Sequence, residues 1–527
     1  MTTSTYQVWG WGRAETDEPK AAQLEQLAPL VRDHLGLPVQ APEQPAPLGE
    51  LPGDRVSTRL PADLAAIASS APLDRAAHSI GRSYRDIIRG VRGQLDDVVD
   101  CVLRPTKESH IAAVLDWCSD AHVAVIPYSG GTSVVGGVEP RIGDEWSGVV
   151  SLDLGSMAGV VEVDATSRTA RVLAGTPGPV LEEQLKAHDL TARFYPQSFE
   201  RSTVGGWVAT RAAGHFATRL THIDDLVESV RAVTPAGVWE SRRLPGSGAG
   251  PSPDRMLLGS EGSLGVVTEA WLRVQPRPTT RWAATLAASS FAVGAHAVRA
   301  LMHDGLLPAT CRLIDAQESR VTGTLTTGQA AVVLGFESYG APIAELSARA
   351  LELCRDEGLE VLEAGERGGA GEAWRSSFVR APYTREQLIL LGLLVETFET
   401  AITWDRFDSF VASVTQAATG ALHRVCGAGT VTCRLTHVYP DGAAPYFTVM
   451  APARRGSELA QWNEVKAAAS DAVLDAGSTI THHHAVGRDH QPWYAEQRPA
   501  PFAAALAAAK RAVDPAGILN PGVVATA

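Results

Sequence analysis

The sequence predicts an α+β protein with more than one domain. Its 527 residues exceed the size at which a single hydrophobic core usually divides. From Val98 onward, runs rich in valine and isoleucine alternate with amphipathic stretches of helical period. Pro276-Arg277-Pro278 interrupts this alternation, and a second series of strands and helices follows it. We therefore expect a domain boundary near these prolines.

The N-terminal part of the chain lacks this alternation. Between about Glu15 and Asp74 it contains proline-rich stretches such as 41–47, which cannot hold a regular helix or a central strand. We predict a wrap over residues 1–95 that is irregular, with some helix.

The expected elements follow in order along the rest of the chain. In the first series, strands are predicted at 100–104, 123–127, 148–153, 160–164, 169–173 and 227–234, and helices at 108–118 and 179–187. In the second series, strands are predicted at 331–336 and 446–451, and helices at 345–356, 406–418, 459–476 and 501–513. Asp514-Pro515 ends the last helix, with Gly517 just beyond it.

Charge and composition exclude several classes of partner. The net charge is −13 and no block of lysine and arginine occurs, which argues against binding nucleic acid or an anionic membrane surface. No apolar run has the length of a bilayer, and neither a secretory leader nor an import signal is recognisable. The six cysteines are scattered without C-x-x-C spacing, as in reduced, buried thiols. We expect a cytoplasmic, bacterial protein.

The most informative segment is the glycine-rich loop Pro127–Gly137, with the sequence PYSGGTSVVGG. Glycines flanked by hydroxyl side chains let successive backbone N–H groups converge on phosphate oxygens. No G-x-x-x-x-G-K-[ST] and no G-x-G-x-x-G that opens a βαβ unit occurs, so this is not an ordinary nucleotide or NAD loop. The segment is predicted to be a cofactor loop, and the alternative is a plain turn between strands.

Two further glycine clusters, 202–207 and 259–269, follow in the same predicted domain. Three such clusters can wrap an extended cofactor that has a diphosphate and a flat ring system. In this order they resemble the flavin domain of the vanillyl-alcohol-oxidase and p-cresol-methylhydroxylase superfamily over about 98–276. The resemblance implies FAD, bound non-covalently because the first loop offers no His or Cys.

The resemblance also implies an architecture and a set of FAD contacts. The architecture is a two-subdomain FAD-binding domain of the vanillyl-alcohol-oxidase type (96–278), an α/β cap domain for the substrate with an antiparallel sheet (279–476), and a C-terminal segment (477–527) that returns to the flavin. The implied contacts are Pro127, Ser129, Gly130, Gly131, Thr132 and Ser133 near the diphosphate, Ser202, Thr203, Gly205, Gly206, Thr210 and Gly214 near the ring and ribityl chain, and Glu261, Gly262, Gly265 and Val267 near the adenosine.

A run of three histidines, His482, His483 and His484, is the second candidate site. On a strand, His482 and His484 would share one face and His483 would point the other way, so at most two rings would address one site. Taken alone, such a run is also compatible with a surface feature.

A catalytic metal is not expected. Metal-dependent relatives in the superfamily carry a G-D-G-N-x-H stretch and a G-E-H-G stretch. Here, in the matching stretch 436–446, a tyrosine stands where the second ligand histidine would be, and His483 replaces the glutamate.

Three features resemble the alkyldihydroxyacetonephosphate synthase family over nearly the whole chain. They are the three histidines, Tyr446 in a strand before them, and the F-E-T-x-x-x-W-D-R stretch 398–406; Trp9-Gly10-Trp11-Gly12 is also similar. The resemblance implies that Tyr446 and the histidines are acid/base groups at the flavin N5. It implies that Arg385 takes part in catalysis and binds the anionic end of the substrate, with Arg312 as a supporting arginine. Either arginine could instead pair with a surface carboxylate.

The implied reaction exchanges the acyl group of acyl-dihydroxyacetone phosphate for a long-chain alkoxy group, with no net redox change. The alternative is an FAD-linked oxidoreductase that acts on an alcohol, hydroxy acid or amine with the same base. A third reading is a binding or structural protein that has kept the fold and lost the chemistry. The implied partners are a lipid substrate, a second copy of the chain and a peripheral membrane contact.

Overall fold

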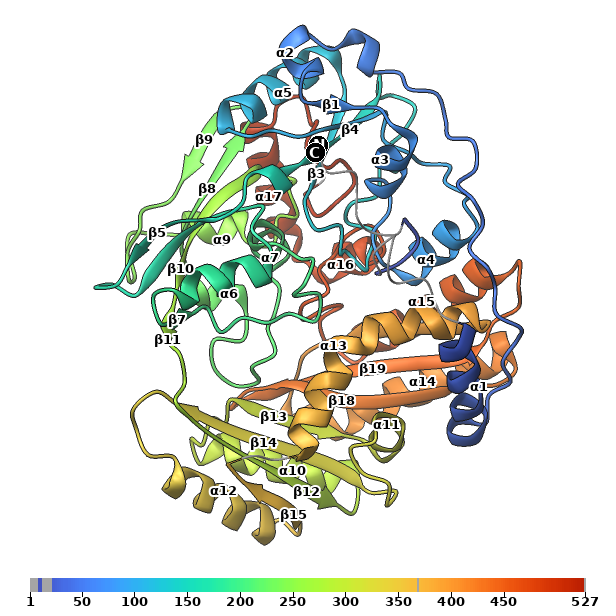
Figure 1. Ribbon diagram of the computed structural model, residues 1–527, viewed down its shortest axis with the longest axis vertical. Helices are drawn as coiled ribbons and strands as arrows, with labels where there is room; N and C mark the ends of the chain where they lie inside the picture. Colours follow the sequence, from blue (N-terminus) through green and yellow to red (C-terminus); the bar gives the residue numbers. More distant parts are fainter. Residues whose placement is uncertain (1–7, 12–20, 367–368, 526–527) are drawn as a thin grey trace.

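The computed structural model describes residues 8–11, 21–366 and 369–525. In Figure 1 the upper half holds two small sheets from the first series of elements, and the lower half holds one large sheet from the second. The predicted α+β fold is confirmed. Two large apolar clusters, one in each half, form the core.

The first small sheet has four strands, ordered β1 (Ala68–Ser69), β2 (Cys101–Leu103), β4 (Val149–Asp153), β3 (Ala124–Tyr128). Strands β2 and β3 both run parallel to β4. The sequences of these three strands are almost continuously apolar, because both faces of a parallel sheet are covered. Helix α5 (Glu108–Ala121) connects β2 to β3.

The second small sheet is antiparallel and has five strands. Its order is β5 (Val160–Asp164), β6 (Thr169–Leu173), β10 (Val266–Arg273), β8 (Val227–Thr234), β9 (Gly237–Glu240). Along most of β10, buried and half-buried side chains alternate, as in a sheet with only one covered face. The strands predicted at 160–164, 169–173 and 227–234 have the predicted bounds.

The lower sheet is antiparallel with eight strands. Its order is β15 (Glu360–Gly365), β12 (Thr280–Ala288), β14 (Ala330–Ser338), β13 (Thr310–Ile314), β18 (Thr430–Val438), β19 (Gly442–Pro452), β16 (Leu393–Glu399), and β17 (Ile402–Thr403) pairs with β19. Helices α10 (Phe291–His303), α12 (Ala344–Asp356), α14 (Phe407–Cys426) and α15 (Glu458–Asp475) pack on this sheet or on one another. Helix α14 runs past the predicted end at 418 because Ala421 and Leu422 are also buried, and it stops at Gly427 with a φ of 80°.

The remaining elements are short apart from α13 and α17. They are β7 (Leu190–Thr191), β11 (Gln275–Pro276), α2 (Ala62–Ala65), α3 (Pro72–Ala77), α4 (Tyr84–Val91), α6 (Gly178–Lys186), α7 (Val204–Thr210), α8 (Ile223–Leu226), α9 (Pro253–Leu257), α11 (Ala316–Thr322), α13 (Gly369–Leu390), α16 (Gln491–Gln497) and α17 (Ala500–Val513), with 3-10 turns at Ser57–Arg59, Leu154–Ser156 and Trp404–Arg406.

The N-terminal wrap is more helical than its prolines suggest. Helix α1 (Ala21–Leu35) forms although Pro29 lies inside it. Leu24 and Val31 are buried in the core of the lower half, with Leu27, Ala28 and Leu35 packed beside them, so apolar residues at helical spacing outweigh the proline. The stretch 41–47 has neither helix nor strand, as predicted.

The end of the chain returns to the upper half. In Figure 1, α16 and α17 lie among the small sheets. Leu519 forms a parallel bridge with Val125 of β3. The C-terminal residues therefore complete the first sheet.

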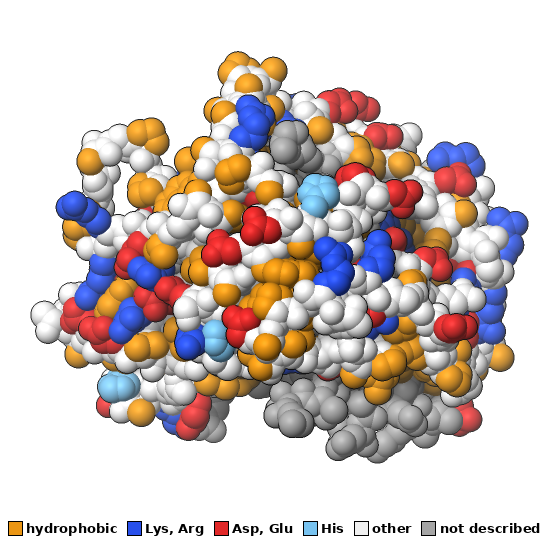
Figure 2. All heavy atoms as spheres, turned by 90° about the horizontal axis from the view of Figure 1, so that it is seen from above, with side chains coloured by type: hydrophobic (Ala, Val, Ile, Leu, Met, Phe, Trp, Pro, Cys, Tyr) orange, Lys and Arg blue, Asp and Glu red, His pale blue; other side chains and the backbone are white. Residues whose placement is uncertain are grey.

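The surface and the cysteines agree with the composition. On the face shown in Figure 2, acidic and basic side chains are interspersed with apolar ones. All six cysteines are free, and all but Cys426 are buried, as predicted. Within the described ranges, no helix combines the length and the apolar character that crossing a membrane requires.

Candidate active site

The three glycine clusters line one cavity between the two halves. The space between its walls, open mouth included, is about 1560 Å³. All sixteen residues predicted to contact FAD lie on its wall: Pro127, Ser129, Gly130, Gly131, Thr132, Ser133, Ser202, Thr203, Gly205, Gly206, Thr210, Gly214, Glu261, Gly262, Gly265 and Val267.

The first and second clusters touch through glycine backbone. A Cβ on Gly130 would lie 2.3 Å from the carbonyl oxygen of Arg201, so only glycine permits this approach. Gly131 has a φ of +61°, a left-handed conformation that favours glycine. The hydroxyls of Ser129 and Thr203 are 2.5 Å apart and link the two segments.

The third cluster is held by the C-terminal segment. The buried carboxylate of Glu261 accepts N–H bonds from Val486 (2.8 Å) and Gly487 (2.9 Å). Burial raises the pKa of Glu261 to about 7. The side-chain amide of Asn520 donates to the carbonyls of Gly137 (3.1 Å) and Glu261 (2.8 Å), and so connects the first cluster to the third.

A buried lysine fixes the segment that carries Asn520. The Lys510 ammonium donates to the carbonyls of Ser263 and Leu519, each at 2.7 Å, and pairs with Asp514 at 2.5 Å. The C-terminal segment is therefore tied to both flanking loops of the cavity.

These residues fit FAD. The wall of the cavity at the first loop consists of backbone that a side chain would obstruct. Loops of this kind present N–H groups to a diphosphate. The individual FAD contacts stay predictions.

The three histidines form a bend, and the predicted strand is wrong. The reason is Glu399, the last residue of β16, which is 1% exposed. Its carboxylate accepts the backbone N–H groups of His482 (2.6 Å), His483 (3.1 Å) and His484 (2.8 Å). The Thr481 hydroxyl donates to it as well, at 2.6 Å. Four donors that converge on one carboxylate cannot belong to an extended strand.

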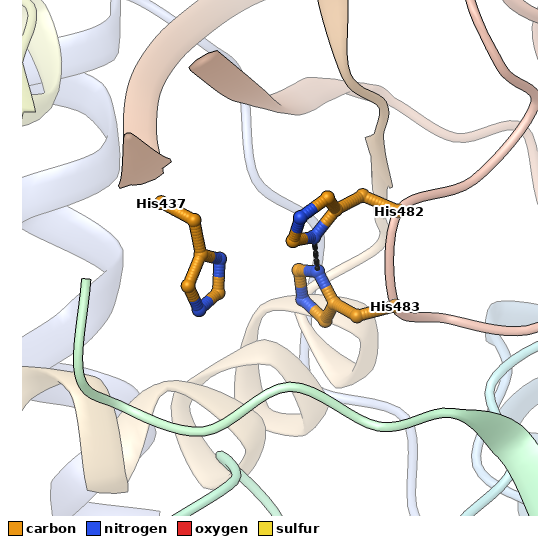
Figure 3. Close-up of side chains that lie close together, drawn as sticks. All are labelled: His437, His482 and His483. Atoms are coloured by element: carbon orange, nitrogen blue, oxygen red, sulfur yellow. Dashed lines mark hydrogen bonds between the residues drawn. The ribbon is translucent and has the colours of Figure 1, made fainter. Parts of the chain in front are cut away.

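The bend also changes which rings face the cavity. His483 and His484 line it together with Tyr446, whereas His482 lies behind the wall. The predicted pairing of His482 with His484 is therefore incorrect, because it assumed strand alternation. His482 and His483 are joined through their Nδ1 atoms, 3.1 Å apart (Figure 3).

Burial keeps most of this cluster neutral. Desolvation lowers the pKa of His484 to about 3 and holds the pKa of His482 well below its usual value. Burial opposes ionisation of Glu399 too, but its electrostatic contacts with His483 and His484 and its hydrogen bond with His483 outweigh it and hold its pKa well below 4.5.

The ring of Tyr446 packs against the buried guanidinium of Arg434. The Arg434 guanidinium is 4.0 Å from the centroid of the Tyr446 ring and forms an ion pair with Glu318. Burial raises the pKa of Tyr446, while Arg434 opposes that rise. Tyr446 therefore stays a neutral hydroxyl at the cavity wall.

The two predicted arginines differ in position. Arg312 of β13 lines the cavity, is 1% exposed and donates to the carbonyl of His215. Desolvation lowers its pKa to about 9. Arg385 of α13 is not on the wall: it donates to the carbonyls of Val395 (3.1 Å) and Arg82 (3.2 Å) and lies 3.8 Å from Glu396. The geometry favours Arg312 as the anion-binding arginine.

Two sets of side chains lie close enough to be considered as metal ligands: His437, His482 and His483, and Glu399, His483 and His484. Several of their atoms are already engaged in hydrogen bonds. His437 Nε2 bonds to the carbonyl of Gly214 at 2.9 Å, and the Glu399 oxygens accept the donors described above. This pattern favours a hydrogen-bonded cluster, and the prediction that no metal binds stays a prediction.

Five residues at or near the site had no predicted role: Trp11, His437, Glu399, His222 and Tyr439. Trp11 and His437 line the cavity. Glu399 lies in the family motif 398–406 and Trp11 in the motif Trp9–Gly12, so these motifs could have indicated that both residues belong to the site. Gly12 lies outside the described residues. Tyr439 contacts His482 from the stretch 436–446, which was compared only with a metal-binding motif, and His222 contacts His482 from a segment without a distinctive pattern.

Comparisons with known proteins agree with this geometry. Residues 99–241 match the family model described as an FAD binding domain, and residues 277–524 match the C-terminal domain of FAD linked oxidases. An alkyldihydroxyacetonephosphate synthase of Dictyostelium discoideum is 28% identical over 482 residues, which cover 85% of this chain and 77% of the relative.

Solved structures show the same fold. An alkyldihydroxyacetonephosphate synthase matches with a TM-score of 0.79 and 22% identity over 98% of both chains. A p-cresol methylhydroxylase matches with a TM-score of 0.69 and 14% identity, over 87% of this chain and 93% of the other. The chain therefore carries an FAD binding domain and a C-terminal domain of FAD linked oxidases, shares the fold of p-cresol methylhydroxylase, and is similar over most of its length to alkyldihydroxyacetonephosphate synthases.

Proposed function

We propose that this protein exchanges the acyl group of an acyl-dihydroxyacetone phosphate for a long-chain alkoxy group. The observation that carries the proposal is the convergence, on one cavity, of the FAD-loop residues with Arg312, Tyr446 and two histidines. The name of the relatives described above supports the same substrate class.

Each wall residue has a role in this exchange. The Arg312 guanidinium can bind a phosphate through two N–H groups. His483 takes a proton from the carbon next to the ketone and later returns it, and Tyr446 donates a hydrogen bond from its neutral hydroxyl. When bound, FAD supplies an electron-poor ring system that accepts electron density from the substrate carbon. The carboxylic acid leaves and the alcohol adds, so the overall reaction is not a redox reaction.

Incubation with acyl-dihydroxyacetone phosphate and labelled hexadecanol is expected to give a labelled ether. The variant His483→Gln should keep its flavin absorbance, because position 483 is not in a glycine cluster. Its rate of ether formation should fall at least about 100-fold, as expected when a general base is removed. Absence of labelled ether from the flavin-loaded wild-type protein would refute the exchange.

The match to a domain of FAD linked oxidases favours a second candidate, oxidation of an alcohol, hydroxy acid or amine. The two candidates differ in what happens to the flavin. Anaerobic bleaching of the flavin absorbance by such a compound, without ether formation, would establish the oxidoreductase.

We also propose that the protein acts as a cytoplasmic homodimer of bacterial origin that touches membrane lipid to collect its substrate. The support is the resemblance to the synthase family and a substrate with long alkyl chains. Light scattering is expected to give twice the chain mass of 55.7 kDa, and the protein should float with neutral lipid vesicles. A monomeric mass would contradict the dimer, and a lack of flotation would contradict the membrane contact.

A further inference from the structure

Three imidazole rings form a continuous series that leads away from the cavity. His483 lines the cavity, and its Nδ1 lies 3.1 Å from Nδ1 of His482. On the far side of His482, its Nε2 lies 3.0 Å from Nε2 of His222, which is half-buried. Figure 3 shows the first of these two links. The rings join a residue of the cavity wall to one that solvent reaches.

One backbone carbonyl determines where the protons sit. Nδ1 of His222 lies 3.2 Å from the carbonyl oxygen of Arg211. A carbonyl can only accept, so Nδ1 of His222 carries the hydrogen and, in the neutral ring, Nε2 is an acceptor. His482 must therefore donate from its Nε2, which leaves its Nδ1 as an acceptor for the Nδ1–H of His483. It follows that the neutral His483 has an unprotonated Nε2.

The contacts around His482 agree with this assignment. The single Nε2–H of His482 is shared between Nε2 of His222 at 3.0 Å and the Tyr439 oxygen at 2.7 Å, while the Tyr439 hydroxyl can donate to Thr221 at 3.3 Å. Burial lowers the pKa of His222, and a proton on the neighbouring His483 would lower it further. Asp224 opposes that shift, and Arg211 adds to it. Neutral rings are the form that can both donate and accept.

We propose that His482 and His222 conduct a proton between His483 and solvent. When Nε2 of His483 gains a proton, its Nδ1 proton passes to Nδ1 of His482. The Nε2 proton of His482 then passes to Nε2 of His222. The half-buried His222 ring turns away from the Arg211 carbonyl, and water takes up its Nδ1 proton as hydronium. Each ring gains one N–H bond and loses one, so none of the three imidazole rings keeps a charge.

The conduit returns to its starting tautomers when a proton travels back. The proposed exchange requires such a return, because the proton taken from the substrate carbon is given back after the alcohol has added. This inference therefore deepens the proposed function and rests on it for its use, although the tautomers themselves do not depend on the substrate.

Nitrogen-15 NMR of histidine-labelled, FAD-loaded protein tests the tautomers directly. We expect His222 to be protonated on Nδ1, with a coupling across the hydrogen bond between Nε2 of His222 and Nε2 of His482. The variant His222→Gln should lose this coupling and keep the flavin spectrum. A His222 protonated on Nε2 would overturn the proposal, whether or not ether product is formed.

Kinetics test the conduction. The variant His222→Ala should lower kcat on the order of tenfold, less than loss of the base itself because water can partly replace the ring, with KM unchanged. Added imidazole should restore the rate in this variant. The matched control is His188→Ala, at an exposed histidine of the same half, which should behave like the wild type with and without imidazole. Unchanged turnover in His222→Ala would overturn the conduit.

Discussion

The variant Gly130→Ala is expected to be purified without its yellow colour. The added Cβ would lie 2.3 Å from the carbonyl oxygen of Arg201 and 3.0 Å from Cα of Ser202, both backbone atoms that cannot rotate away. The first two glycine clusters must therefore move apart. Because a displacement of about 1 Å in a preorganised site costs roughly 100-fold, FAD affinity should fall at least that far. The ratio of flavin absorbance to protein absorbance, after dialysis against FAD, measures the loss.

Gly420→Ala is the matched control. Gly420 is exposed within helix α14, and no atom lies within 4 Å of the position of its Cβ. Alanine there should leave the flavin content unchanged and raise the free energy of unfolding by up to about 1 kcal/mol. A Gly130→Ala protein with one bound FAD per chain would contradict the contact between the two clusters.

Glu399→Gln is expected to abolish turnover while the protein keeps its FAD. The amide would present its own N–H group to at least one of the N–H donors at 481–484, so the bend would open and His483 would move. A displaced catalytic group should cost at least about 100-fold in kcat. The flavin should remain because Glu399 does not line the cavity.

The same variant is expected to lose stability in a pH-dependent manner. The pKa of Glu399 in the folded protein lies below the ordinary value of 4.5, so its charge stabilises the fold above about pH 4.5 and this contribution disappears as the pH falls further. Loss of one partner from a buried, hydrogen-bonded charge cluster costs about 3 kcal/mol. Urea unfolding should therefore separate wild type from variant at pH 7, and the gap should narrow below pH 4.5.

Two further variants make this result specific. Glu399→Asp keeps the charge and should recover part of the rate. Glu352→Gln, at an exposed helical ion pair, should change the free energy of unfolding by less than about 0.5 kcal/mol at any pH. Equal stability of Glu399→Gln and wild type at pH 7 would show that the carboxylate does not hold the bend.

The cofactor wall could be predicted from sequence because its signal is local. Clusters such as 129–133 and 202–206 carry glycines and hydroxyls at positions that backbone contact requires, and this requirement acts within a few residues. The strands at 160–164 and 227–234 were predictable for a similar reason, since apolar and β-branched runs define them. In each case the residues that set the structure are neighbours in the chain.

The histidine bend could not be predicted in the same way. Its shape depends on Glu399, more than eighty residues earlier, and the proton positions depend on His222, at a greater distance still. Strand alternation was the only local rule available, and it selected the wrong pair of rings. Helix α1 shows the converse case, because the prolines were a local signal and burial of Leu24 and Val31 against a distant sheet overrode it.

The amide of Asn520 has a consequence for biogenesis. It connects the first glycine loop to the third, and both ends of that connection are synthesised more than 250 residues earlier. A nascent chain thus carries every glycine loop long before the residue that joins them leaves the ribosome. We expect coenzyme loading to be a post-translational event.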